Sequence, residues 1–293
     1  MESKNPILRD AVKQDGFAYT EGVNAYNQAA AGTATLDQQI GAPATGVPTG
    51  TRPMTIDDVV TKTAFAFVVM LVGAGIGWVL TPSIPFLPFI AMIAALIVFF
   101  VGAFRKTPGA GVVLTYSALE GVMLGGISMF YQDYVDTQGN GTNIVFQAVL
   151  GTFVAFAVML LLYRSRIIKV NGTFVKIMMI AMVSYFVIAL ASFIAALFGV
   201  GGGWGFYGVG GLGLLLCVIG VGLAAFTLNL DFASIEQGIR EGLPEKYSWV
   251  MALGLIVTLV WLYLELLRFL AILNSNTGHG RDSAGPTGLA HPD

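Results

Sequence analysis

Seven long apolar stretches occupy most of this chain after residue 60, and they constrain its fold more than any other feature. A helix needs roughly 20 residues to cross a hydrocarbon layer of about 30 Å. The chain is 56% apolar and 11% charged, whereas a soluble domain carries about 25% charged residues. The sequence therefore predicts an all-α, polytopic membrane protein with seven transmembrane helices. We place the spans near residues 64–80, 86–104, 112–131, 144–163, 174–198, 209–228 and 249–273.

Lys and Arg residues next to these spans fall on one side of the predicted membrane. They occur before the first span and between spans two and three, four and five, and six and seven, whereas the other connectors have none. Because basic residues near spans stay on the cytoplasmic side, we expect the N-terminus inside and, with seven spans, the C-terminus outside.

The two ends of the chain differ in composition from the spans. Residues 1–60 are polar and rich in Ala, Gly, Thr and Pro, which predicts a disordered cytoplasmic tail. Thr55 and Asp58 have the spacing of a capping box, so the end of this tail should start a helix. Residues 61–273 form the predicted membrane domain, and residues 274–293 are predicted to be a second flexible tail.

Enzyme signatures are mostly absent from this sequence. Both histidines, His279 and His291, follow the last span, so neither a Ser-His pair nor a histidine metal site can form inside the membrane. The net charge of −2 gives no reason to expect nucleic-acid binding. We expect no catalytic activity and no bound cofactor.

Three carboxylates, Glu120, Asp231 and Glu265, interrupt the apolar spans or lie at their ends. A charged group at the bilayer centre costs about 2.5 to 3.5 kcal/mol on insertion scales, so such an acid normally has a partner, a proton or an ion. Each also has a simpler interpretation. Asp231 could lie in interfacial water, Glu265 could pair with Arg268 three residues later, and Glu120 could bond a neighbouring helix.

Glycines and further acids surround the third span. The spacing of Gly121 and Gly125, with Gly126 beside them, predicts close packing against another helix. Asp133 and Asp136 follow at the outer end of the span. They either belong to a solvated loop or raise the local cation concentration at the mouth of a pore.

Three short motifs at these acids resemble those of the transmembrane Bax inhibitor motif family, especially its long-tailed actinobacterial branch. The resemblance covers roughly residues 54–273 and rests on Tyr116-Ser-Ala-Leu-Glu-Gly121, Asp231-Phe-Ala-Ser-Ile235 and Leu262-Tyr-Leu-Glu265. It implies seven helices with a central last helix and, for the best understood members, a pH-sensitive calcium leak.

In such members two aspartates share a proton in the closed state, and the first corresponds to Asp231. The second falls on Glu265 if the Leu-Tyr-Leu-acid motif is matched, or on Thr258 if the last span is aligned without gaps. The resemblance also implies a cationic partner for Asp231 at the inner end of span two, where Arg105 and Lys106 stand.

Taken together, these features predict a calcium leak, or a calcium–proton exchanger, in the plasma membrane of a bacterium. Ca²⁺ prefers six to eight oxygen ligands, and Asp231, Glu265 and Glu120 could supply a weak site for it as the transported ion. The alternative is a modulator of a membrane-bound protease, which would act through the N-terminal tail. Its partners would then include that protease as well as the lipid bilayer.

Overall fold

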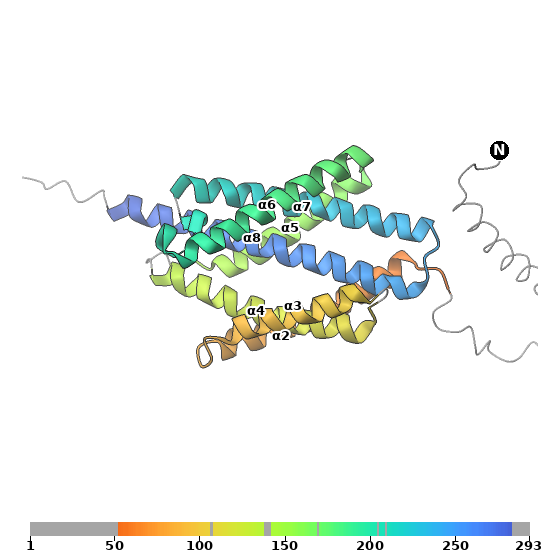
Figure 1. Ribbon diagram of the computed structural model, residues 1–293, viewed down its shortest axis with the longest axis horizontal. Helices are drawn as coiled ribbons and strands as arrows, with labels where there is room; N and C mark the ends of the chain where they lie inside the picture. Colours follow the sequence, from red (N-terminus) through yellow and green to blue (C-terminus); the bar gives the residue numbers. More distant parts are fainter. Residues whose placement is uncertain are drawn as a thin grey trace, which may run out of the picture. The chain divides into compact units, whose positions relative to one another are not determined.

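The computed structural model describes residues 52–105, 108–137, 142–168, 170–203, 205–208 and 210–282 (Figure 1). Seven of its helices are long and apolar enough to cross a membrane, which confirms the predicted fold class for the described part of the chain. These are α2 (Ile56–Leu80), α3 (Leu87–Phe104), α4 (Ala110–Thr137), α5 (Ile144–Arg164), α6 (Gly172–Leu197), α7 (Gly210–Arg240) and α8 (Ser248–Asp282). In the described connections the chain forms three 3-10 helices: η2 (Val200–Gly203), η3 (Gly205–Gly208) and η4 (Glu245–Tyr247).

The first membrane helix begins at the predicted capping box. The Thr55 hydroxyl accepts a hydrogen bond from the Asp58 amide at 3.3 Å, and the Asp58 carboxylate accepts one from the Thr55 amide at 2.9 Å. Two orphan N–H groups at the start of α2 are thereby satisfied. Residues 1–51 of the predicted tail lie outside the described residues.

Several helices extend beyond their predicted spans, and the extensions of α7 and α8 are among the longest. Helix α7 continues twelve residues past residue 228 to Arg240, and α8 continues past residue 273 to Asp282. Apolar composition marks where a helix leaves the membrane, but the backbone hydrogen bonds of a helix can continue into water. Asp231 therefore lies within α7 rather than at its end.

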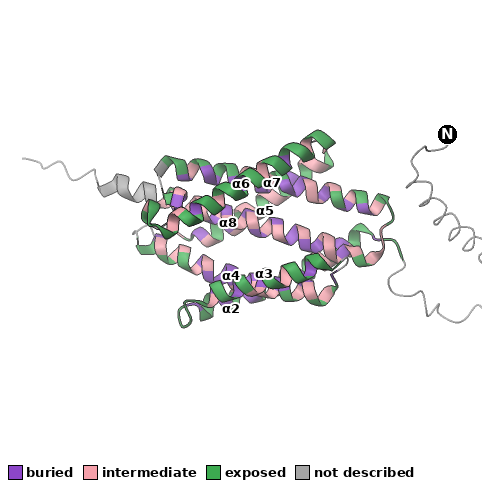
Figure 2. Cartoon of the chain, viewed as in Figure 1, coloured by how far each residue is buried: buried purple, intermediate pink, exposed green. Residues whose placement is uncertain are grey.

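Helix α8 lies at the centre of the bundle, as the resemblance implied. It packs against α2, α4, α5 and α7. Half of the apolar window of α8 is buried, compared with 17% for α6, and Figure 2 shows mostly buried or half-buried residues along α8 and mostly exposed ones along α6. Most exposed side chains of α6 beyond Lys176 are apolar, which is the arrangement expected of a helix that faces lipid.

Reciprocal glycines bring α2 and α4 into close contact. A Cβ atom built on Gly121 would lie 2.1 Å from the Met70 carbonyl oxygen, and one on Gly125 would lie 2.0 Å from that of Ala74. Gly77 of α2 would meet Val122 of α4 in the same way, at 2.1 Å. The close packing predicted for Gly121 and Gly125 is therefore confirmed, with α2 as the neighbour.

The connection between α6 and α7 folds back onto the bundle. Gly205 has φ +62°, and a Cβ atom there would lie 2.1 Å from the Ser192 carbonyl oxygen, so this position needs glycine for both reasons. The Ser192 hydroxyl accepts a hydrogen bond from the Phe206 amide at 3.0 Å. This anchoring holds Tyr207 against Tyr185 of α6, with 3.0 Å between their hydroxyl oxygens.

The base of the N-terminal tail is attached to the connection between α7 and α8. The Met54 amide donates to the Leu243 carbonyl at 2.7 Å, and the Glu245 amide donates to the Arg52 carbonyl at 2.9 Å. Met54 is 1% exposed and packs with Val59 of α2 and Ile235 of α7. The last residues of the predicted tail are thus part of the folded bundle.

Candidate functional site

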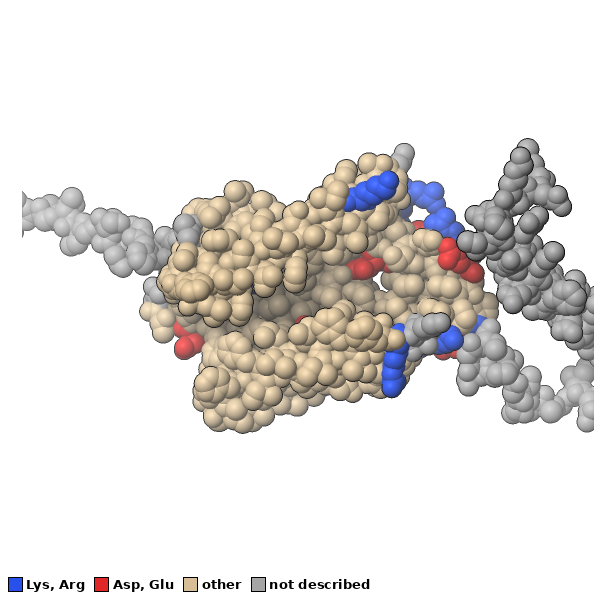
Figure 3. All heavy atoms as spheres, viewed as in Figure 1, with Lys and Arg blue, Asp and Glu red and all other residues tan. Residues whose placement is uncertain are grey.

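Charged side chains are distributed unevenly over the bundle. Figure 3 shows Lys and Arg gathered at the end that carries the connection between α7 and α8, and a hollow between the layer of α2 to α4 and the layer of α6 and α7. Glu245 at this end accepts hydrogen bonds from Arg52 at 3.0 Å and Lys62 at 3.1 Å. The membrane-spanning region between the two ends holds few charges, and Asp231 and Glu265 each form a separate site there.

Asp231 forms the first site with residues of α8. Thr258, which is 5% exposed, lies next to it, and its hydroxyl interacts with the Asp231 carboxyl group. An ideal Cβ atom on Gly254 would lie 3.8 Å from Asp231 Oδ1, so the acid faces the α8 backbone where a side chain is missing. The Oδ2 atom is buried and has no hydrogen-bond partner among the described residues.

Other polar atoms near this depth also lack partners within the described part of the chain. They are the Thr63 hydroxyl and both side-chain polar atoms of Asn229, which is fully buried. Val59 of α2 packs against Ile235 of α7. Helices α2 and α7 run in opposite directions. Thr63 of α2 and Asp231 of α7 therefore both lie one helical turn further into the bundle than this contact. A buried polar group without a partner is costly, so this level of the bundle is suited to hold water or a cation.

Glu265 forms the second site, nearer the other end of α8, and is 3% exposed. Its Oε1 atom accepts hydrogen bonds from the Tyr185 hydroxyl at 2.9 Å, from Trp261 Nε1 at 3.3 Å and from Arg268 Nη1 at 3.2 Å. The guanidinium carbon of Arg268 lies 4.4 Å above the Tyr207 ring centroid. Glu265 thus has both an ion-pair partner and two neutral donors.

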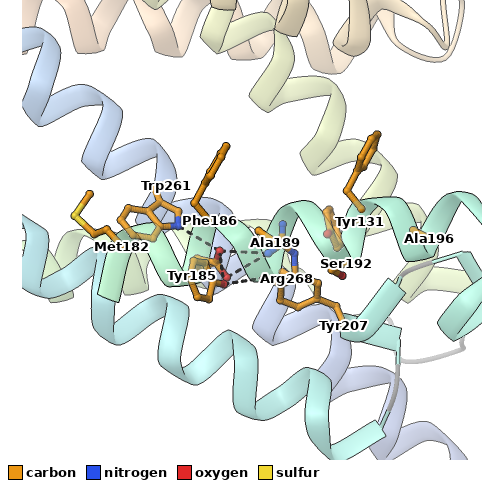
Figure 4. Close-up of a pocket in the computed structure, with 12 residues that line it drawn as sticks. Tyr131, Met182, Tyr185, Phe186, Ala189, Ser192, Ala196, Tyr207, Trp261 and Arg268 are labelled. Atoms are coloured by element: carbon orange, nitrogen blue, oxygen red, sulfur yellow. Dashed lines mark hydrogen bonds and ion pairs between the residues drawn. The ribbon is translucent and has the colours of Figure 1, made fainter. Parts of the chain in front are cut away.

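The second site borders a cavity of about 570 Å³. Figure 4 shows Tyr185, Trp261 and Arg268 among the lining side chains, and these three donate hydrogen bonds to the Glu265 carboxylate. A Cβ atom on Gly220 of α7 would lie 2.7 Å from Glu265 Oε2, so a glycine is needed there to admit the carboxylate.

The two sites lie along one face of α8. Gly254, Thr258, Trp261 and Glu265 follow at intervals of four, three and four residues, which places them on a single stripe. Seven residues separate Thr258 from Glu265, a rise of about 10 Å. Thr258, and not Glu265, is therefore the residue of α8 beside Asp231, as the ungapped alignment implied.

Glu120 faces a different part of the bundle. It is 8% exposed and interacts with Tyr116 one turn earlier on α4. Tyr116 packs in a core cluster with Ile256 and Val260 of α8, and these two residues lie on another face of α8 than the stripe. Glu120 is thus separated from Asp231 by the body of α8.

The structure does not join the three carboxylates into one site. In the regions that it describes, no group of three or more His, Cys, Asp or Glu side chains could hold a metal ion. The expected site from Asp231, Glu265 and Glu120 is therefore not formed here, because two helical turns separate the first two and α8 separates the third.

The expected cationic partner of Asp231 is also not in place. Arg105 is exposed at the end of α3 and forms no ion pair with any described residue. Helix α3 packs mainly against α4 and not closely against α7, which carries Asp231. Lys106 lies outside the described residues. Asp133 and Asp136 are exposed at the far end of α4, where Asp136 accepts a hydrogen bond from Gln132 at 2.9 Å.

Sequence reasoning missed several residues that line these sites. Tyr185 and Tyr207 come from α6 and η3, and no spacing along the chain links them to Glu265. Thr63 and Asn229 gave a weak signal, because each is a polar residue at the cytoplasmic half of an apolar helix. Polar residues are common at such positions, so the sequence alone does not identify these two as site residues. The packing of α2 against α7 is needed to identify them.

The comparison with protein families agrees with this arrangement. No curated protein matches the chain significantly. A family model described as Bax inhibitor 1 like matches residues 5–275, nearly the whole chain. With seven membrane-spanning helices and a central last helix, the chain belongs to the Bax inhibitor 1 like family of membrane proteins.

Proposed function

We propose that this protein is a pH-sensitive calcium leak channel, or calcium–proton exchanger, of a bacterial plasma membrane. The observation that carries the proposal is the Asp231 carboxylate, which lies inside a helix of the membrane bundle with no cation paired to it among the described residues and with one oxygen atom unpartnered. An unpaired acid in such a place is normally part of an ion or proton path. Family membership supports the same reading.

The chemistry of the Asp231 site suits weak, reversible binding of Ca²⁺. Ca²⁺ takes oxygen ligands from carboxylates, hydroxyls, carbonyls and water, and Asp231, Thr63 and Thr258 offer the first two kinds. A site with one carboxylate holds the ion loosely, which favours conduction over retention. Protonation of Asp231 would remove its negative charge, so acid should weaken cation entry.

The path that we propose follows the contact between α7 and α8. Between the two sites, Thr227 of α7 approaches Met182 of α6, with 3.8 Å between its hydroxyl and the sulfur atom. Trp261 stands one turn above Thr258 on α8. The bulky side chains of Met182 and Trp261 would narrow the path between the Asp231 site and the outer cavity. Glu120 is not on this path, because it faces another side of α8.

The test is Ca²⁺ flux into liposomes that contain the purified protein, measured at several pH values with an entrapped indicator. Asp231→Asn keeps the side-chain size but removes the titrating group, so it should change the leak rate and abolish its pH response. Asp57→Asn is the matched control, because Asp57 is an exposed acid at the start of α2. Wild-type flux and pH response in Asp231→Asn would reject the proposal.

The protease-modulator hypothesis stays open as a second candidate, because the base of the tail is fixed at the same end of the bundle as the Asp231 site. A modulator should lose function when residues 1–50 are deleted and should tolerate Asp231→Asn. A leak should show the reverse pattern. Both variants keep the segment from Arg52 onward, which is hydrogen-bonded to the connection between α7 and α8. A difference between them therefore cannot come from loss of that segment.

A further inference from the structure

The cavity beside Glu265 opens toward the lipid and not only toward the interior of the bundle. One wall is α6, whose Phe186 is 67% exposed, and the other includes Tyr131 of α4. Helix α6 packs against α7, η2 and η3, and Figure 3 shows the hollow between its layer and the layer of α4. Apolar chains of the bilayer can therefore reach the cavity from the side.

The lining of the cavity is part polar and part apolar. Its polar part consists of Arg268, Glu265, Tyr131, Tyr185, Ser192 and Tyr207. Met182, Phe186 and Trp261 give an apolar or aromatic lining on one side of Arg268 (Figure 4). Arg268 lies 20 residues after Ser248, where α8 begins. At 1.5 Å per residue this is about 30 Å, the thickness of the hydrocarbon core, so Arg268 lies at the depth of lipid headgroups.

Arg268 is suited to bind a further anion at this depth. It is the only Lys or Arg in the sequence between Lys246 and Arg281. A guanidinium group has five N–H donors. Its bonds to Glu265 use Nη1, and it also bonds the Tyr131 side chain, so two or more donors remain after these contacts. The Tyr207 ring below the guanidinium and the Glu265 carboxylate beside it fix its orientation. Arg binds phosphate well when its planar group is held in this way.

We propose that the cavity binds one phospholipid from the adjacent leaflet, with its phosphate on Arg268 and an acyl chain along Phe186, Met182 and Trp261. A cavity of about 570 Å³ is within the usual range of roughly 300 to 1,000 Å³ for sites that bury an organic ligand. The lipid would fill the space beside the Arg268–Glu265 ion pair. This proposal does not depend on the calcium leak, since it concerns binding alone.

The experiment uses Trp261 as a reporter of the acyl chain. In full-length protein with Trp78, Trp204 and Trp249 replaced by Phe, Trp261 is the only tryptophan, and lipids with brominated chains quench its fluorescence on contact. We compare a brominated phospholipid with a phosphate-free glycolipid that has the same chains, in bilayers of otherwise equal composition. A protein that keeps only Trp78, which is 39% exposed on α2, reports the bulk lipid.

We expect Trp261 to be quenched several-fold more by the phospholipid than by the glycolipid, and Trp78 to be quenched equally by both. Arg268→Gln should remove the preference, and Arg268→Lys should restore part of it. Equal quenching in the parent protein, or a preference that survives Arg268→Gln, would overturn the proposal. So would loss of quenching on addition of inorganic phosphate, because the site would then bind the free anion.

A second variant covers the case in which Arg268→Gln fails to fold. Ala189 lines the cavity from α6, so Ala189→Phe should fill it and exclude the acyl chain while leaving the ion pair intact. Quenching of Trp261 should then fall to the level given by the glycolipid. Unchanged, phospholipid-selective quenching in Ala189→Phe would show that the lipid lies elsewhere.

Discussion

The contact between α2 and α4 gives the sharpest test of the fold, because two glycines on one helix should respond to the same substitution with opposite signs. In Gly77→Ala the new methyl group would lie 2.1 Å from the Val122 carbonyl oxygen. An ordinary contact begins at 3.4 Å, so the two backbones would have to separate by roughly 1 Å. Overpacking of this kind typically costs about 1 to 3 kcal/mol.

Gly75→Ala is the matched control on the same helix. A Cβ atom there has no neighbour within 4 Å. Alanine is favoured over glycine inside a helix by about 1 kcal/mol, so this variant should be neutral or more stable than the parent. The gain in helix propensity applies to both variants and cancels in the comparison, so the predicted difference in unfolding free energy between Gly77→Ala and Gly75→Ala is about 1 to 3 kcal/mol.

The measurement is unfolding of each purified protein in mixed micelles with increasing sodium dodecyl sulfate, followed by helical circular dichroism. Gly77→Ala should unfold at a clearly lower detergent fraction than Gly75→Ala. Equal midpoints for the two variants would refute the reasoning, because they would mean that α2 and α4 are not in backbone contact at this position.

Three further changes test other parts of the structure. Glu245→Gln should weaken the attachment of the N-terminal segment by about 1 kcal/mol or less, since the paired side chains are partly exposed, and amide hydrogen exchange at Met54 should become faster. Thr258→Asp should place a second carboxyl group beside Asp231, so that the two share a proton and the liposome flux closes more tightly in acid. A reporter fused after Pro292 should be active outside the cytoplasm, and one in the connection between α7 and α8 should be active inside.

The membrane helices and their caps could be predicted because their signals are local. An apolar run of helical length, the Thr55 capping box and the spacing of Gly121 and Gly125 each depend on residues near one another in sequence. The physical causes are the desolvation of a helix and the close approach of two backbones. Each requires a residue pattern that can be recognised within a single segment of the sequence. The structure agrees with all three.

The partners of the buried acids could not be predicted in the same way. Glu265 could be linked by spacing to Arg268 on its own helix, but Tyr185 and Tyr207 come from other elements. The neighbour of Asp231 depended on the alignment of α8 against α7, and a shift of two turns exchanges Thr258 for Glu265. Such registers are set by the packing of whole helices, here of α7 against α8, which brings Asp231 close to Gly254 and Thr258.

The position of the second acid has a consequence for the proposed pH response. Two carboxyl groups in contact hold one proton between them and titrate as a pair. Here Thr258 occupies the contact position, and Glu265 is held two turns away by Arg268. Thr258 can offer Asp231 a hydroxyl but no second negative charge, so Asp231 would change its protonation alone. A leak controlled by Asp231 should then follow the titration curve of a single carboxyl group, without the two-step profile of a coupled pair.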